Sequence, residues 1–75
     1  MDELTFRIRP YSKRELARLY FPDTLLDESA VANLRNLIKR NPELLEELKK
    51  AHYNPHNKIL TPRQVSIIAD FLGEP

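Results

Sequence analysis

The chain has 75 residues, of which 41% are hydrophobic and 31% charged, and its formal net charge is +1. This composition is typical of a soluble globular protein, and the length suffices for one hydrophobic core, so residues 1-75 are predicted to form a single domain. The chain has no cysteine and one glycine. Disulfide scaffolds, cysteine-ligated zinc fingers, thiol nucleophiles and glycine-rich phosphate loops are therefore excluded.

The beginning of the sequence indicates a cytoplasmic protein. The segment from Met1 to Thr5 is acidic, whereas a secretory signal peptide begins with basic residues. No apolar run is long enough to span a membrane. We therefore expect a protein of the cytoplasm without membrane contact.

A short strand is predicted near the start of the chain. Residues Phe6 to Arg9 alternate apolar and basic side chains, and Pro10 stops the pattern. Because a lone strand needs a partner, we expect it to pair with a second short strand over Lys58 to Leu60. That segment follows a turn at Asn54 to Asn57. The two segments would form a two-stranded β ribbon.

The first helix is predicted to begin at Lys13. Ser12 and Glu15 have the spacing of a capping box, in which the serine hydroxyl accepts a hydrogen bond from the Glu15 N–H and the glutamate accepts one from the serine N–H. Phe21 precedes a proline and is disfavoured in the helical conformation, so the helix should end there after about two turns.

Two further helices are predicted in the middle of the chain. Asp27 or Ser29 can cap the first of them. Asn41 followed by Pro42 ends that helix and begins the next, because asparagine is a good cap and proline suits the first helical position. The apolar stripes of these two helices are formed by Ala30, Val31, Leu34, Leu37 and Ile38, and by Leu44, Leu45, Leu48 and Ala51.

The last helix repeats the capping pattern of the first. Thr61 is the cap, Pro62 occupies the first helical position, and Gln64 completes the capping box. Gly73 is expected to end the helix in the left-handed conformation that glycine adopts easily.

Apolar residues cover more than one face of this last helix. Ile67 and Phe71 lie on a different side from Val65, Ile68, Ala69 and Leu72. Burial among three other helices would explain so wide a stripe, and so would an interface for self-association or for a partner protein. We expect either Ile67 or Phe71 to be exposed, and both are candidate interface residues.

No pattern in the sequence indicates catalysis. His52 and His56 have the spacing of a helical zinc site, but Pro55 prevents a continuous helix between them. Acidic residues in the first turns of a helix are favoured by the helix dipole alone. This explanation covers Glu43, Glu46 and Glu47. We expect no enzyme activity, no metal and no cofactor.

Basic residues gather in two parts of the sequence. The segment from Arg7 to Arg18 contains five basic residues and one acidic residue, and the helix after Asp27 should turn its polar residues to solvent. Arginine and asparagine recognise guanine and adenine edges. A short helix followed by a helix that carries them is the arrangement of a helix-turn-helix. The candidate DNA-binding residues are Arg7, Arg9, Lys13, Arg14, Arg18, Arg35, Asn36, Lys39 and Arg40.

Two features oppose this DNA-binding interpretation. The connection from Phe21 to Glu28 is longer than the usual helix-turn-helix turn and lacks its glycine. Asp23, Asp27 and Glu28 also place negative charge beside the helix that would read the bases.

Several motifs carry a resemblance to a known family. They are Leu19-Tyr20-Phe21-Pro22, Leu60-Thr61-Pro62-Arg63-Gln64-Val65 and the final Leu72-Gly73-Glu74-Pro75. With them the chain resembles, over nearly its whole length, a domain-of-unknown-function family of short, stand-alone proteins from gut bacteria. No activity is established for that family, so the resemblance implies the fold and the compartment and no site. The Leu60 to Val65 entry into the last helix is also similar to parts of excisionase-type and MerR-type helix-turn-helix domains.

These observations predict a mainly α fold, a compact bundle of four short helices that is helix-turn-helix-like and includes a two-stranded β ribbon. The leading hypothesis for function is a small DNA-associated accessory or regulatory protein that binds double-stranded DNA. The alternative is an adaptor that binds another protein through the last helix or the Leu25-Leu26 loop, without contact to nucleic acid.

Overall fold

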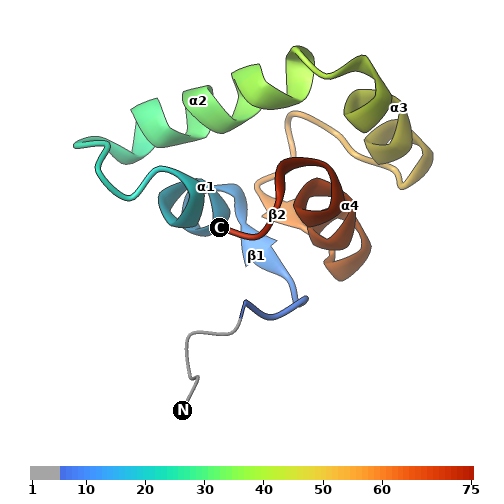
Figure 1. The fold of residues 1–75 in the computed structure, drawn as a ribbon, viewed down its shortest axis with the longest axis horizontal. Helices are drawn as coiled ribbons and strands as arrows, with labels where there is room; N and C mark the ends of the chain where they lie inside the picture. Colours follow the sequence, from blue (N-terminus) through green and yellow to red (C-terminus); the bar gives the residue numbers. More distant parts are fainter. Residues whose placement is uncertain (1–5) are drawn as a thin grey trace.

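The computed structural model describes residues 6–75 and shows a mainly helical fold (Figure 1). Its elements are β1 (Tyr11–Ser12), α1 (Lys13–Tyr20), α2 (Asp27–Lys39), α3 (Pro42–Lys50), β2 (Ile59–Leu60) and α4 (Pro62–Leu72). In Figure 1, α2 runs along one edge of the molecule, with α1, the two strands and α4 beneath it and α3 beyond its carboxyl end. The predicted bundle of four short helices with a two-stranded ribbon is confirmed.

The ribbon begins later in the chain than the sequence pattern predicted. β1 is antiparallel to β2, with Tyr11 opposite Leu60, whereas Phe6 to Pro10 form no strand. The prediction of a strand over Phe6 to Arg9 is therefore wrong, although its partner segment is right to within one residue. Pro10 has no N–H to donate to a ladder. Before it, the chain packs against Tyr11, whose ring stacks on Phe6 at 5.5 Å between ring centres.

The starts of α1 and α4 both have the predicted capping boxes. Ser12 Oγ accepts a hydrogen bond from the Glu15 N–H at 3.0 Å, and Glu15 Oε1 accepts one from the Ser12 N–H at 3.0 Å. At α4, Thr61 Oγ1 accepts from the Gln64 N–H at 3.2 Å, and Gln64 Oε1 accepts from the Thr61 N–H at 3.1 Å. Each box satisfies two backbone donors that a helix start leaves without a partner.

The start of α2 differs from the prediction. Neither Asp27 nor Ser29 is the cap, because the cap position is Leu26, whose side chain accepts no hydrogen bond. Asp27 is the first helical residue, and its carboxylate faces two arginines of α1. The predicted cap of α3 is confirmed, since Asn41 Oδ1 accepts from the Leu44 N–H at 3.2 Å.

Gly73 ends α4 with a positive φ of 84°, which glycine accommodates without strain. Its ψ of 160° is extended, so the residue is not in the left-handed helical conformation that was expected. Its N–H donates to the Ala69 carbonyl at 2.8 Å, which completes the last turn.

The core takes side chains from the four helices and both strands. Its fully buried centre includes Leu16, Leu44, Leu48, Leu60, Val65 and Ile68. Among the described residues, Gln64 is the buried polar side chain, and its Nε2 donates to the Ala51 carbonyl at 2.9 Å. Ile67 is partly buried and Phe71 is 38% exposed, which confirms that one of this pair reaches solvent. No helix in residues 6–75 has the length and apolarity required to cross a bilayer.

Candidate functional site

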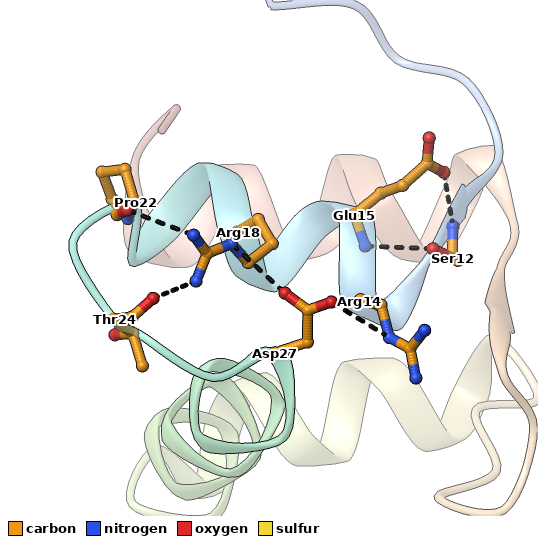
Figure 2. Close-up of polar contacts among 7 residues, drawn as sticks. All are labelled: Ser12, Arg14, Glu15, Arg18, Pro22, Thr24 and Asp27. Carbon is orange, nitrogen blue, oxygen red and sulfur yellow. Dashed lines mark hydrogen bonds and ion pairs between the residues drawn. The ribbon is translucent and has the colours of Figure 1, made fainter.

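Two of the candidate DNA-binding arginines are engaged with Asp27 (Figure 2). Arg14 Nε lies 3.7 Å and Arg18 Nε 3.4 Å from the two carboxylate oxygens of Asp27. Arg18 also donates to the backbone carbonyls of Thr24 and Pro22. Figure 2 shows its guanidinium lying between these carbonyls and Asp27. Arg18 therefore holds the connection between α1 and α2 in place.

The two arginines before β1 lie around Tyr11. The Arg9 guanidinium carbon is 3.8 Å from the Tyr11 ring centre, and Arg9 Nη1 donates to the Pro10 carbonyl at 2.7 Å. The Arg7 carbonyl accepts a hydrogen bond from the Tyr11 hydroxyl at 2.9 Å. Both arginine residues are exposed, and these contacts fix the segment that leads into the ribbon.

Lys13 connects the start of α1 to the turn after α3. Its Nζ donates to the carbonyls of Asn54 at 3.1 Å and Pro55 at 2.7 Å, and it lies 5.0 Å from the centre of the Tyr53 ring. Burial, and then the nearby positive charge of Arg35, lower the pKa of Lys13 below its usual value. Lys13 and Arg35 line one depression, so the two basic segments of the sequence meet here.

Three adjoining depressions surround this meeting point. The first is lined by Lys13, Arg35 and Tyr53 among others, the second by Arg35, Lys39, Lys49, Tyr53 and His56, and the third by Lys13, Arg14, His56 and Lys58. Because they share residues, they form one continuous surface. None of the residues from 6–75 that line it is acidic. We call it the basic surface, defined as Lys13, Arg14, Arg35, Lys39, Lys49, Tyr53, His56 and Lys58.

The basic surface includes only part of the predicted set. Lys13, Arg14, Arg35 and Lys39 belong to it. Asn36 on α2 and Arg40, which directly follows that helix, are exposed but do not line the depressions. Arg7, Arg9 and Arg18 do not line them either. The two predicted clusters therefore meet through Lys13 and Arg35.

Sequence reasoning missed four residues of the basic surface: Lys49, Tyr53, His56 and Lys58. The position of Lys49 in the last turn of α3 is explained by the helix dipole, and the residues that follow were interpreted as a polar turn. A signal was present in the run from Lys49 to Lys58, which contains no acidic residue.

Tyr53 supplies an aromatic ring at the centre of the basic surface. Burial raises the pKa of its hydroxyl, and the nearby Arg35 opposes that rise. The phenol is therefore neutral at physiological pH, and its ring can contact the Lys13 ammonium.

The two histidines do not lie on one helix. α3 ends at Lys50, and His52 has a positive φ of 68°, which turns the chain away from the helix. His52 and His56 therefore do not share a helical face. No group of three potential metal-ligating side chains occurs within residues 6–75.

Acidic residues lie on a different surface, between α3 and α4. A groove there is lined by Pro42, Glu43, Glu46, Glu47, Ile67, Asp70 and Phe71. It shares no residue with the basic surface. The net charge of +1 thus conceals one depression lined by several acidic residues and another surface lined by several basic ones.

Comparison with protein families matches residues 7–75 to DUF4248, a domain of unknown function. The chain belongs to this family. The resemblance to a domain-of-unknown-function family is confirmed, and the match covers all the helices and both strands. Comparisons with curated proteins and with solved structures returned no match. A function for this DUF4248 chain therefore has to be argued from its own surfaces.

Proposed function

We propose that this protein binds double-stranded DNA through the basic surface, as a small accessory or regulatory protein. The supporting observation is the convergence of Lys13, Arg35, Lys39, Lys49 and Lys58 on one surface, from three helices and the turn before β2. Lysine and arginine side chains bind the phosphate backbone and release its counterions. This function requires a compartment that holds DNA, and we propose the bacterial cytoplasm.

In this proposal α2 is the helix that enters the major groove. It has 13 residues and presents Arg35, Asn36 and Lys39 to solvent, and the exposed Arg40 follows it as the C-cap. An α-helix fits the major groove, where arginine recognises guanine and asparagine recognises adenine. α1 packs against α2, and in a helix-turn-helix the first helix likewise accompanies the helix that enters the groove.

The long connection between α1 and α2 is compatible with this arrangement because it is braced. Arg18 contacts Asp27 and the carbonyls of Thr24 and Pro22. These contacts replace the rigidity that a tight turn would supply. Arg14 and Arg18 therefore position α2, and the phosphate contacts come from Lys49 and Lys58.

Fluorescence anisotropy with duplex DNA tests the proposal. Affinity should fall between about 50 and 200 mM salt, and Lys49→Ala should reduce the slope of log affinity against log salt by about one. Arg35→Ala should cost about 1–3 kcal/mol of discrimination at one base pair. Arg63→Ala is the matched control, because Arg63 is exposed at the start of α4 and outside the basic surface. Folded protein that does not bind at the lower salt, or a Lys49→Ala effect equal to the control, would contradict the proposal.

The second candidate function is an adaptor that binds a protein through α4 without contacting nucleic acid. The observation that favours it is the groove beside α4, where Phe71 is 38% exposed. If DNA binding is absent, pull-down with Phe71→Lys as the negative control tests this function. Capture that is the same with wild type and variant would contradict it.

A further inference from the structure

The groove between α3 and α4 is lined by both apolar and negatively charged side chains. Ile67 and Phe71 provide apolar surface from α4, while Glu43 and Glu46 of α3 and Asp70 of α4 provide carboxylates. Within residues 6–75, the ion pair formed by a groove carboxylate is the one between Glu47 and Lys50, at 3.3 Å. A matching occupant must be positively charged and able to cover an aromatic ring.

The carboxyl-terminal end of α2 has these properties. Arg35, Lys39 and Arg40 are exposed at its carboxyl-terminal end. In Figure 1 this helix runs along an edge of the molecule. Its 13 residues span about 20 Å, which is longer than the 11-residue α4 that forms one wall of the groove. We call Arg35, Lys39 and Arg40 the α2 ridge.

The charges of the ridge and the groove also match in spacing. Arg35 and Lys39 are four residues apart on α2, and Glu43 and Glu46 are three apart on α3. Side chains at these separations lie about 5–6 Å apart on one helix face. A helix laid in a groove with complementary charges at matching intervals is a common mode of recognition.

Phe71 provides the apolar part of the contact. An arginine guanidinium packs favourably against an aromatic ring, and its aliphatic stem covers apolar surface while the charge stays close to carboxylates. The partial exposure of Phe71 beside Asp70 suits an arginine of the ridge.

We propose that this protein self-associates head to tail, with the α2 ridge of one copy in the α3–α4 groove of the next. The ridge and the groove share no residue, so one copy offers both at once. Such a heterologous contact links copies into a chain, which stays open unless the rotation from one copy to the next closes a ring. The proposal goes beyond DNA binding and does not rest on it. Because Arg35 and Lys39 also belong to the basic surface, DNA and a second copy would compete for them.

Sedimentation analysis without DNA tests self-association. At low salt the average mass of the wild type should rise with protein concentration above the 8.8 kDa of one chain, and added salt should reverse the rise. Glu46→Lys should reduce the mass to that of one chain. Asp23→Lys, the same charge reversal in an exposed loop residue, should associate like the wild type. Asp70→Lys replaces Glu46→Lys if circular dichroism shows that the latter is unfolded.

Mixing two variants tests the head-to-tail geometry. Glu46→Lys blocks the groove and keeps the ridge, whereas Arg35→Ala with Lys39→Ala blocks the ridge and keeps the groove. Each should be monomeric alone, and their mixture should give a one-to-one dimer that grows no further. A wild type that stays monomeric at low salt, equal effects of Glu46→Lys and Asp23→Lys, or a mixture without dimers would overturn the proposal. DNA is absent from these measurements, so their failure leaves DNA binding to its own test.

Discussion

The helices α1 and α4 begin in the same way, yet the two capping boxes occupy different environments. Each helix follows a two-residue strand of the same ribbon. The hydrogen bonds in the two boxes are also similar, with lengths between 3.0 and 3.2 Å. Glu15 of the first box is exposed to solvent. Gln64 of the second is 4% exposed and has an additional hydrogen bond, from its Nε2 to the Ala51 carbonyl.

The difference follows from the chemistry of the two side chains. An ionised glutamate only accepts hydrogen bonds, whereas a glutamine amide accepts with its oxygen and donates with its nitrogen. Gln64 therefore caps α4 and at the same time holds the end of α3, while Glu15 serves the start of α1 alone. One local motif thus has a local role in one place and a tertiary role in the other.

The largest expected effect comes from replacing the second side chain of each capping box, Glu15 or Gln64, with methionine, which forms none of its hydrogen bonds. Gln64→Met keeps an unbranched side chain but leaves the buried Ala51 carbonyl without its partner. We expect a loss of about 2–3 kcal/mol, because an unsatisfied buried polar group costs that much. Glu15→Met removes an exposed carboxylate near a helix start and should cost about 0.5–1 kcal/mol. Urea unfolding of both variants measures the contrast, and equal losses would show that the two environments do not matter.

Removing the cap residue should lower the stability by a similar amount at both helix starts. Ser12 and Thr61 each accept one backbone N–H, so Ser12→Ala and Thr61→Ala should each cost about 1 kcal/mol. Ser29→Ala is the matched control, because Ser29 is exposed inside α2 and caps nothing. Its unfolding midpoint should stay near that of the wild type, and a shift as large as that of Ser12→Ala would contradict the assigned caps.

A helix start can be predicted from the sequence where the capping side chain and the backbone N–H that it binds are only three residues apart. The boxes at Ser12 and Thr61 and the cap at Asn41 form their hydrogen bonds locally, so their sequence pattern is sufficient. Asp27 looked like a cap because it precedes an apolar stripe. Its carboxylate instead pairs with arginines of another helix, and no local pattern encodes that contact.

The position of strand β1 and the full set of residues in the basic surface could not be predicted, because both depend on tertiary contacts. The alternation from Phe6 to Arg9 suited a strand, but Pro10 and the packing on Tyr11 moved the pairing to the next residues. Lys13, Arg35 and Lys39 were selected for their charge. Lys49 and Lys58 join them only because the turn after α3 folds onto α1, through the Lys13 hydrogen bonds to Asn54 and Pro55.

Unlike α1 and α4, α2 begins without a capping box. Asp27 pairs with Arg14 and Arg18 at partly exposed positions. Exposed ion pairs contribute little, so Asp27→Asn should cost about 0.5 kcal/mol and less in high salt. Asp23→Asn, in the same connection, serves as the control. If Asp27→Asn is more destabilising than Ser12→Ala in urea unfolding, ion pairing at this helix start is stronger than capping at α1.

The far ends of the two boxed helices are also joined, by a contact that depends on pH. The Tyr20 hydroxyl at the end of α1 donates to the Gly73 carbonyl after α4 at 2.6 Å. Burial, and then the negative charge of Glu74, raise the pKa of Tyr20 from 10.0 to about 12. The folded state thus favours the protonated phenol.

A pKa that is higher in the folded than in the unfolded state has a definite consequence for stability. The contribution of Tyr20 is fully present below pH 10 and is lost as the pH rises towards 12. The difference in unfolding free energy between wild type and Tyr20→Phe should be constant below pH 10 and should change between pH 10 and 12, in the direction of a less stable wild type. Tyr53 also has a raised pKa, but it is present in both proteins and cancels. Tyrosinate absorbance identifies the titrating group, and two stability curves that remain parallel up to pH 12 would contradict the coupling of the two helix ends.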